Sequence, residues 1–384
     1  DEKSMDALDY LVYCLKEEGI YCYLDMTTYR KFKSGDGVAF AEEMGDCHKW
    51  YALYDPVMID LQKEYMEKIW DHYNPYTGLK YKDDPVFVLS EMTNENGLWF
   101  DSKLKNGGIS VDVIIPSDYM IERMIKEDML LELNFDNIEN FKYVDEQFRN
   151  PAFDPENKYS VPYTWGTVGI LYNTKFVSEE DVTGWELLWN EKYAGKILMF
   201  DNSRDAFGIT QYMLGYDVNT TDPAELQACA DKLAEQKPVL QQYVMDQIFS
   251  TMQNEEAWIA PYYAGDCLTM MGENENLAFY LPEDQGFNLF IDAMCIPTCC
   301  QEKEAAELFI NFMCDPEISG ANMDYICYGS PIVGARDYMD EYLAESEVVY
   351  PADEILANGT SYSFLPEEIS RYVEGLFMKV RNSG

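Results

Sequence analysis

Basic residues are scarce in this 384-residue chain, which has 28 Lys plus Arg against 70 Asp plus Glu and a formal net charge of −42. Nucleic-acid binding depends on basic surface, so we do not expect DNA or RNA as a partner. Residues 1–105 carry 12 basic and 21 acidic residues, and residues 106–384 carry 16 and 49. The acidic excess of the second part predicts attraction of cationic ligands, although a merely solubilising acidic surface is an alternative explanation.

Long apolar runs are also missing, since no stretch approaches the roughly 20 residues that span a bilayer. The N-terminus has no basic and apolar leader, so we expect any export signal to be absent from this chain. The composition is 47% apolar and 15% aromatic, which suffices for two or three well-buried domains. We therefore expect a soluble globular protein.

Metal-ligand patterns are absent as well. The chain has only two histidines, His48 and His72, and its ten cysteines form no CxxC pair with zinc-like spacing. We expect no metal and no cofactor. The cysteines lie in apolar stretches, which predicts small buried side chains in a reducing setting. That setting conflicts with export of the protein, and the sequence leaves the conflict open.

Residues 1–105 alternate between helical and extended patterns. Apolar positions at helical spacing run from Met5 to Leu15 and end before Gly19, and a second amphipathic helix is predicted over Asp55 to Tyr73. Short apolar strands are predicted over Ile20 to Met26 and over Val86 to Met92. Helix, strand, helix, strand is typical of an α/β protein with parallel strands.

Two stretches of this first part, GIYCYLDMTTYRKFKSGDGV and PVFVLSEMTNEN, resemble the third and fourth barrel strands of cellulase-like retaining glycoside hydrolases. The resemblance implies that Asn94 contacts a sugar and that Glu95 is the acid/base. A retaining enzyme also needs a second carboxylate, and nothing barrel-like follows residue 105. Two strands cannot close an eight-stranded barrel, and an Asn-Glu pair is also common in ordinary turns.

Residues 106–384 continue the α/β alternation at greater length. Val111 to Ile115 reads as a strand that turns at Pro116 and Ser117 into a helix with an apolar face. KILMF, AWIAPYY and FNLFIDAM are further strand-like runs, and EAAELFINFMCDP is helical. Strands feeding helices in this manner predict doubly wound α/β lobes.

The strongest resemblance in the chain lies here. DVIIPSDYMIERMIKEDML, NPAFDPENKYSVPYTWGTVGILYN, GWELLWNEKYAGKILMFDN, NTTDPAEL and DAMCIP resemble, in order and spacing, the polyamine-binding receptors of ATP-driven spermidine/putrescine importers. The resemblance implies a two-lobed, hinged fold like that of periplasmic binding proteins. It also implies a monomer that works outside the cytoplasm, delivers its ligand to the membrane subunits of an ABC importer and catalyses no reaction.

The chemistry of a polyamine fits the residues that the resemblance points to. Ammonium groups separated by methylenes call for carboxylates and aromatic faces. Carried over by position, the ligand-binding residues are Ser117, Tyr119, Asp205, Tyr263, Phe290, Asp292 and Tyr328. Asp292, between Ile291 and Ala293 in an apolar strand, is the best single candidate because an unpaired buried carboxylate is unfavourable.

Each of these residues also has an ordinary structural explanation. Ser203 or Asp205 could cap the helix that begins near Ala206, and the aromatic residues could belong to the core. The family usually has Asp where this chain has Asn202, and some members have Trp at the positions of Tyr263 and Phe290. Fewer anions and weaker cation–π faces predict a preference for putrescine over spermidine.

For the organisation of the chain we predict a hydrolase-like segment at 1–105, one receptor lobe at 106–164 and 290–336, and a second lobe at 165–289 and 337–384. The receptor family has a first strand and helix before the equivalent of Ser110, and we find no counterpart of them in residues 1–105. Three hypotheses remain: a polyamine receptor, a glycoside hydrolase fragment, or a non-natural chimera with no coherent activity. An unpaired sheet edge would favour misfolding in the last case.

Overall fold

The computed structural model describes all residues except 1, 18–21, 26–37, 39–55, 92–110 and 383–384. The chain divides into two compact units, Asp1–Ile109 and Ser110–Gly384. In the described part of the chain, no helix combines the length and the apolar character needed to cross a membrane.

The first unit contains the helices and parallel strands that the sequence predicts. Its elements are α1 (Glu2–Glu17), β1 (Cys22–Asp25), α3 (Pro56–Trp70), β2 (Tyr73–Asn74), β3 (Leu79–Lys80), the 3-10 turn η2 (Tyr81–Asp83) and β4 (Phe87–Glu91). Strands β1 and β4 pair in parallel, while the short antiparallel pair of β2 and β3 was not predicted. A small core of Val12, Tyr81 and Val86 joins α1 to the end of the unit.

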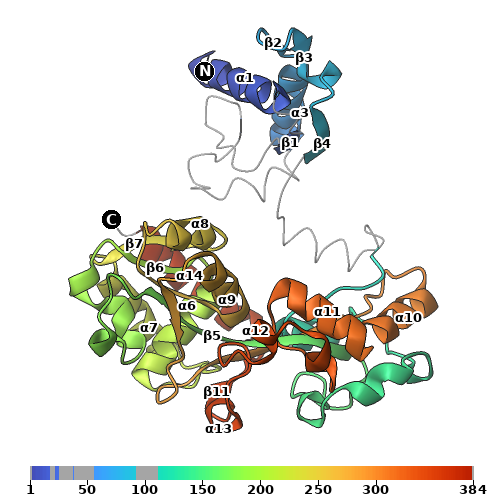
Figure 1. Cartoon of the computed structure of the whole chain (residues 1–384), viewed down its shortest axis with the longest axis vertical. Helices are drawn as coiled ribbons and strands as arrows, with labels where there is room; N and C mark the ends of the chain where they lie inside the picture. Colours follow the sequence, from blue (N-terminus) through green and yellow to red (C-terminus); the bar gives the residue numbers. More distant parts are fainter. Residues whose placement is uncertain (1, 18–21, 26–37, 39–55, 92–110, 383–384) are drawn as a thin grey trace. The chain divides into compact units, whose positions relative to one another are not determined.

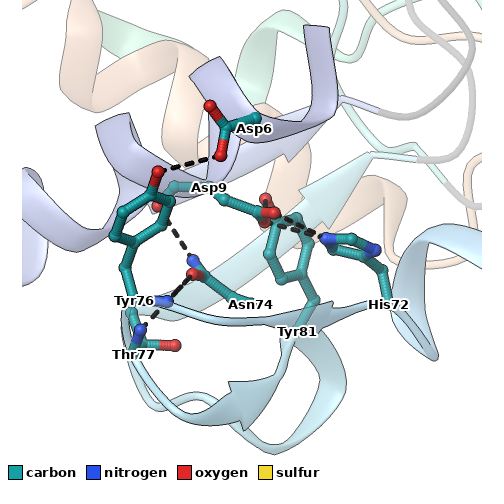
Figure 2. Close-up of polar contacts among 7 residues, drawn as sticks. All are labelled: Asp6, Asp9, His72, Asn74, Tyr76, Thr77 and Tyr81. Atoms are coloured by element: carbon teal, nitrogen blue, oxygen red, sulfur yellow. Dashed lines mark hydrogen bonds and ion pairs between the residues drawn. The ribbon is translucent and has the colours of Figure 1, made fainter. Parts of the chain in front are cut away.

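A polar network around Asp9 also ties α1 to the β2–β3 region (Figure 2). Asp9 is only 3% exposed. His72 donates from Nε2 to its two carboxylate oxygens at 2.9 and 2.8 Å, and the Tyr81 hydroxyl donates at 2.8 Å. Asn74 donates to the Asp9 carbonyl at 2.9 Å, and Tyr76 donates to Asp6 at 2.8 Å. These bonds join positions more than 60 residues apart, so they stabilise the fold of the unit.

The second unit is a mixed α/β structure, as predicted. Its strands are β5 (Ser160–Asn173), β6 (Ile197–Phe200), β7 (Leu240–Val244), β8 (Ile259–Tyr263), β9 (Leu277–Tyr280), β10 (Phe287–Cys295) and β11 (Gly359–Thr360). Its α-helices are α5 (Asp118–Lys126), α6 (Ser203–Leu214), α7 (Pro223–Gln236), α8 (Gln247–Gln253), α9 (Ala264–Glu273), α10 (Lys303–Met313), α11 (Pro316–Ile326), α12 (Glu341–Ala344), α13 (Asp353–Leu356) and α14 (Glu367–Asn382). Short 3-10 turns lie at Phe135–Asn137, Glu139–Tyr143, Glu146–Phe148, Glu179–Asp181, Trp185–Trp189, Glu191–Tyr193 and Ala335–Tyr338.

One sheet runs through the second unit in the order β11-β10-β5-β8-β6-β7, with β9 pairing β5. The long antiparallel pair of β5 and β10 places Phe290 opposite Gly166 and Asp292 opposite Thr164. In Figure 1, β5 passes between a group of helices that includes α6, α7, α8 and α14 and a group that includes α10 and α11. The two strands therefore connect the two ends of this unit.

Two hydrophobic clusters form the cores of these two ends. The larger contains β6 and β8 residues, such as Phe200 and Ile259, together with Phe377 of α14. The smaller contains Val161 and Trp165 of β5 together with Met294, Ile310 and Ile332. Both β5 and β10 contribute to both clusters, because each strand is long enough to extend from one core into the other.

Five of the eight described cysteines are buried, as predicted: Cys229, Cys267, Cys295, Cys299 and Cys314. The other three, Cys14, Cys300 and Cys327, are only partly buried. The buried cysteines pack as small apolar side chains. For example, Cys229 and Cys267 belong to the larger core cluster.

Candidate ligand-binding cleft

A cavity with a volume of about 890 Å³ in the second unit lies beside β5 and β10. Its walls come from the start of α5, the start of α6, the β8–α9 junction, β10 and the segment after α11. The polar and charged lining residues are Ser117, Asp118, Thr164, Asn202, Arg204, Asp205, Asp246, Asp266, Asn288 and Asp292. The apolar and aromatic ones are Ile115, Tyr119, Tyr163, Met245, Tyr262, Tyr263, Phe290, Tyr325, Ile326, Tyr328 and Tyr362.

All seven residues proposed from the sequence line this one cavity, namely Ser117, Tyr119, Asp205, Tyr263, Phe290, Asp292 and Tyr328. They come from five separate places in the chain, and the fold brings them together. Asn94 and Glu95, the candidates for sugar chemistry, lie outside the described residues.

Aromatic rings form one continuous wall of the cavity. The Tyr263 and Phe290 rings meet edge to face with centroids 5.6 Å apart, and Phe290 and Tyr328 meet likewise at 6.2 Å. Glycine makes this packing possible: a Cβ at Gly166, opposite Phe290 in β5, would lie 2.8 Å from the Phe290 ring. Such rings offer apolar area for methylenes and negative faces for cations.

Asp205 lies at the first turn of α6 and is almost fully buried. Its Oδ2 accepts from the Tyr263 hydroxyl at 2.8 Å and from Asn202 Nδ2 at 2.9 Å. Burial raises the pKa of Asp205 to about 6, opposed by the Tyr263 hydrogen bond and by Arg204. The helix cap is Asn202, whose side chain accepts from the Arg204 N–H at 2.8 Å, and the alternative that Ser203 or Asp205 caps this helix is wrong.

Asp292 and Asp118 are the least satisfied acids in the cavity. Asp292 Oδ1 and Asp118 Oδ2 are both buried without a hydrogen-bond partner. Burial raises the pKa of Asp292, and a hydrogen bond from Ser117 opposes the rise. Burial also raises the pKa of Asp118 to about 7, with the charge of Asp292 adding to the effect. Unpaired buried carboxylates are unfavourable, so this part of the cavity favours a cation.

A further acid, Asp266, lies in the first turn of α9. Its Oδ2 accepts from the Tyr328 hydroxyl at 2.9 Å. Burial raises the pKa of Asp266 to about 6, and the Tyr328 hydrogen bond opposes the rise. Two of the acids, Asp205 and Asp266, are therefore each held by a tyrosine that also forms part of the aromatic wall.

Arg204 is the one cationic side chain among the described lining residues. It donates to the Val218 carbonyl at 2.8 Å, to Asn219 Oδ1 at 2.7 Å and to the Ser363 carbonyl at 3.2 Å. Its guanidinium also lies 4.3 Å from the centroid of the Tyr362 ring. The hydrogen-bond donors of Arg204 are therefore directed to Val218, Asn219 and Ser363 and not to the neighbouring acids. A ligand can neutralise the charge of those acids.

The lining residues that were not proposed from the sequence include Asp118, Asp266 and Tyr362. Asp118 stands between Ser117 and Tyr119 in PSDYM, and Asp266 ends the motif PYYAGD, so both lay within stretches already singled out. Tyr362 gave no signal, because it comes from an irregular segment near the C-terminus, far from the other site residues in sequence. The described residues contain no group of three or more His, Cys, Asp or Glu side chains placed to hold a metal ion.

Comparison with known proteins identifies clear relatives. The family model "Bacterial extracellular solute-binding protein" matches residues 109–356. A spermidine/putrescine-binding periplasmic protein of Escherichia coli (strain K12) is 30% identical over 248 residues, which cover 65% of this chain and 71% of the relative. A solved structure described as a putative spermidine/putrescine ABC transporter from Listeria monocytogenes has 33% identity and a TM-score of 0.71, covering 79% of this chain and 93% of that one.

A third relative bears on where the resemblance begins. Spermidine/putrescine-binding periplasmic protein 1 of Haemophilus influenzae is 29% identical over 310 residues, which cover 80% of this chain and 84% of the relative. Residues 106–384 are too few to account for this coverage, so the match begins before residue 106. We had expected the resemblance to start at residue 106. The hydrolase alternative for residues 1–105 finds no support in these matches.

Proposed function

Because the chain belongs to the family of bacterial extracellular solute-binding proteins, we propose that it binds a polyamine and delivers it to the membrane subunits of an ABC importer. Its relatives are binding proteins and not enzymes, and this chain is likewise a non-enzyme. The relatives described above carry spermidine and putrescine in their names, and two of them are called periplasmic. We accordingly place the action of this protein outside the cytoplasm.

The observation that carries the proposal is the imbalance of charge in the cavity. Asp118, Asp205, Asp266 and Asp292 line it, and its one guanidinium is already engaged. A polyamine supplies ammonium groups for these carboxylates, and its methylenes can lie along the wall of Tyr263, Phe290 and Tyr328. An anionic or uncharged solute would leave the buried acids without a compensating positive charge.

Asn202 supports putrescine as the preferred ligand. Its side chain caps α6 and donates to Asp205, so it supplies no anion to a third ammonium group. Ring faces of Tyr and Phe also attract cations less strongly than Trp does. We therefore propose tighter binding of the diamine than of the triamine.

Binding is proposed to bring the two ends of the unit together. The cavity is lined by residues of both ends, and β5 and β10 connect them. In two-lobed binding proteins, a ligand held by both sides favours closure about such crossing segments. Small-angle scattering of the purified chain should show a smaller radius of gyration with saturating putrescine, and an unchanged radius would argue against closure.

Isothermal titration calorimetry tests the proposed ligand. The chain is titrated at pH 8 and low salt with putrescine, with spermidine, and with 1,4-butanediol, which keeps the four-carbon chain and lacks both charges. We expect saturable binding of the two amines, weaker at high salt, and no saturable heat with the diol. A folded chain that binds neither amine would overturn the proposal.

Delivery and oligomeric state need separate measurements. Uptake of labelled putrescine by the source cells should fall when the gene is deleted and return when it is restored. We propose that the protein acts as a monomer and binds no nucleic acid, which light scattering and a DNA titration check directly.

A further inference from the structure

Asp118 occupies the first turn of α5 and is only 1% exposed. Its Oδ1 accepts from the Tyr119 backbone N–H at 2.7 Å, while its Oδ2 is buried without a hydrogen-bond partner. The side chain nevertheless lines the candidate cleft. A buried carboxylate with an unused oxygen beside a cavity is suited to receive a charged donor from a ligand.

The backbone holds Asp118 next to the strand that carries Asp292. Ser117 pairs with Asp292 in an antiparallel bridge, and the Ala293 N–H donates to the Pro116 carbonyl at 3.1 Å. Asp292 also keeps one buried oxygen, Oδ1, without a hydrogen-bond partner. Two acids with unused oxygens therefore lie on adjacent backbone segments.

The charged and titratable groups that interact with Asp118 are Tyr119 of α5, Arg204 and Tyr212 of α6, Asp292 of β10, and Tyr362. Arg204 is the only cation in this set, and its donors are directed to Val218, Asn219 and Ser363. Without a counter-ion, two neighbouring buried carboxylates do not both stay ionised, and one retains a proton.

We propose that Asp118 is a further polyamine-recognition residue, which holds one ammonium group together with Asp292, and that binding releases a proton from this pair. The inference rests on the proposed function. The carboxylic acid gives its proton to the solvent, and the resulting carboxylate accepts the N–H of the ammonium group, so charge is conserved within the site.

The raised pKa of Asp118 agrees with its position beside Asp292 in a buried site. Burial raises its pKa to about 7, and Asp292 adds to the rise. The Tyr119 N–H, the nearby Ile291 N–H and the Arg204 guanidinium oppose it. A ligand cation lowers the pKa of the pair, so protons leave on binding and affinity increases with pH.

The experiment counts protons by calorimetry of putrescine binding at pH 7 in two buffers of different ionisation enthalpy. For the unmodified chain we expect release of at least about half a proton per ligand, and an increase in affinity of about tenfold from pH 6 to pH 8. This measurement needs no variant, so it holds even if a substitution disturbs folding.

Asp118→Asn keeps the shape of the side chain and should lower affinity about tenfold at pH 8, with little change at pH 6, and reduce proton release by about half a proton. Asp136→Asn is the matched control, since this exposed acid lies outside the cleft. It removes the same charge and should leave both quantities unchanged.

The outcomes separate the two proposals. Putrescine binding with no proton release, or an Asp118→Asn chain that matches the unmodified one at pH 8, overturns the role of Asp118 and leaves the proposed function standing. A folded chain that binds no polyamine overturns the proposed function and this inference with it.

Discussion

Two buried aspartates in this protein have opposite surroundings. Asp9, in the first unit, is 3% exposed and accepts hydrogen bonds from His72 and Tyr81 on both carboxylate oxygens. Asp118, in the second unit, is 1% exposed and has one oxygen without a partner. Burial is nearly equal in the two cases, so burial alone does not distinguish them.

The difference is the source of the compensating donors. Asp9 is satisfied by its own chain, which makes it part of the fold. Asp118 and its neighbour Asp292 are satisfied only in part, which destabilises the free protein and leaves an acceptor for a ligand. An incompletely satisfied acid beside a cavity thus indicates a binding site, and a completely satisfied one indicates structure.

The largest expected effect comes from Asp292→Asn, which removes an anion from the cleft and keeps its shape. We expect putrescine affinity to fall about 100-fold or more, since a buried charge-assisted contact is lost. Thermal stability of the free chain should not fall, because no ion pair is broken. Calorimetry with a parallel melting curve measures both, and unchanged affinity would remove Asp292 from the site.

Asp9→Asn should lower the stability of the first unit and leave ligand affinity unchanged, the opposite of what we expect for Asp292→Asn. The substitution removes the charge and replaces the Oδ2 acceptor of His72 with an NH₂ donor, so we expect a loss of about 2–3 kcal/mol in the stability of the first unit, with putrescine affinity unchanged. Hydrogen exchange of α1 in the full chain measures this loss. Asp6→Asn is the control, because the exposed Asp6–Tyr76 contact should contribute little to stability.

Asp118→Asn should stabilise the free protein at high pH. Burial raises the pKa of Asp118 to about 7, above the value of about 4 that an Asp has in the unfolded chain, so the cost of this acid to stability grows from about pH 4 and is complete above pH 7. We expect the variant to be more stable by about 2 kcal/mol or more at pH 8 and by a smaller amount at pH 5. Urea unfolding at the two pH values tests this, and equal effects at both would contradict it.

The smallest effect is expected for Tyr263→Phe. The hydroxyl donates to Asp205 Oδ2 at 2.8 Å and opposes the rise in the pKa of that acid. Removing it should raise this pKa further and weaken putrescine binding about fivefold at pH 6, with a smaller loss at pH 8. The ring stays in place, so a loss that is equal at both pH values would point instead to a direct contact with the ligand.

Much of this architecture could be predicted from the chain. Apolar periodicity located α1, α3, α10 and the strand pair β1 and β4 to within a few residues, because burial of a face requires that period. The seven proposed residues were found by their motifs, and they line one cavity. The short β2–β3 pair and the irregular segment of Tyr362 were missed, since neither has a period to recognise.

Local sequence patterns set helix starts and strand faces, so the presence of acids at the starts of α5 and α6 and within β10 follows from the sequence. Which of these acids lack a partner depends on contacts between distant segments. In NSRD, Arg204 precedes Asp205 and adjacency alone would pair them as an internal salt bridge. The fold instead holds the guanidinium with Val218, Asn219 and Ser363. Charge compensation depends on contacts between distant segments, and those contacts leave the cleft acidic.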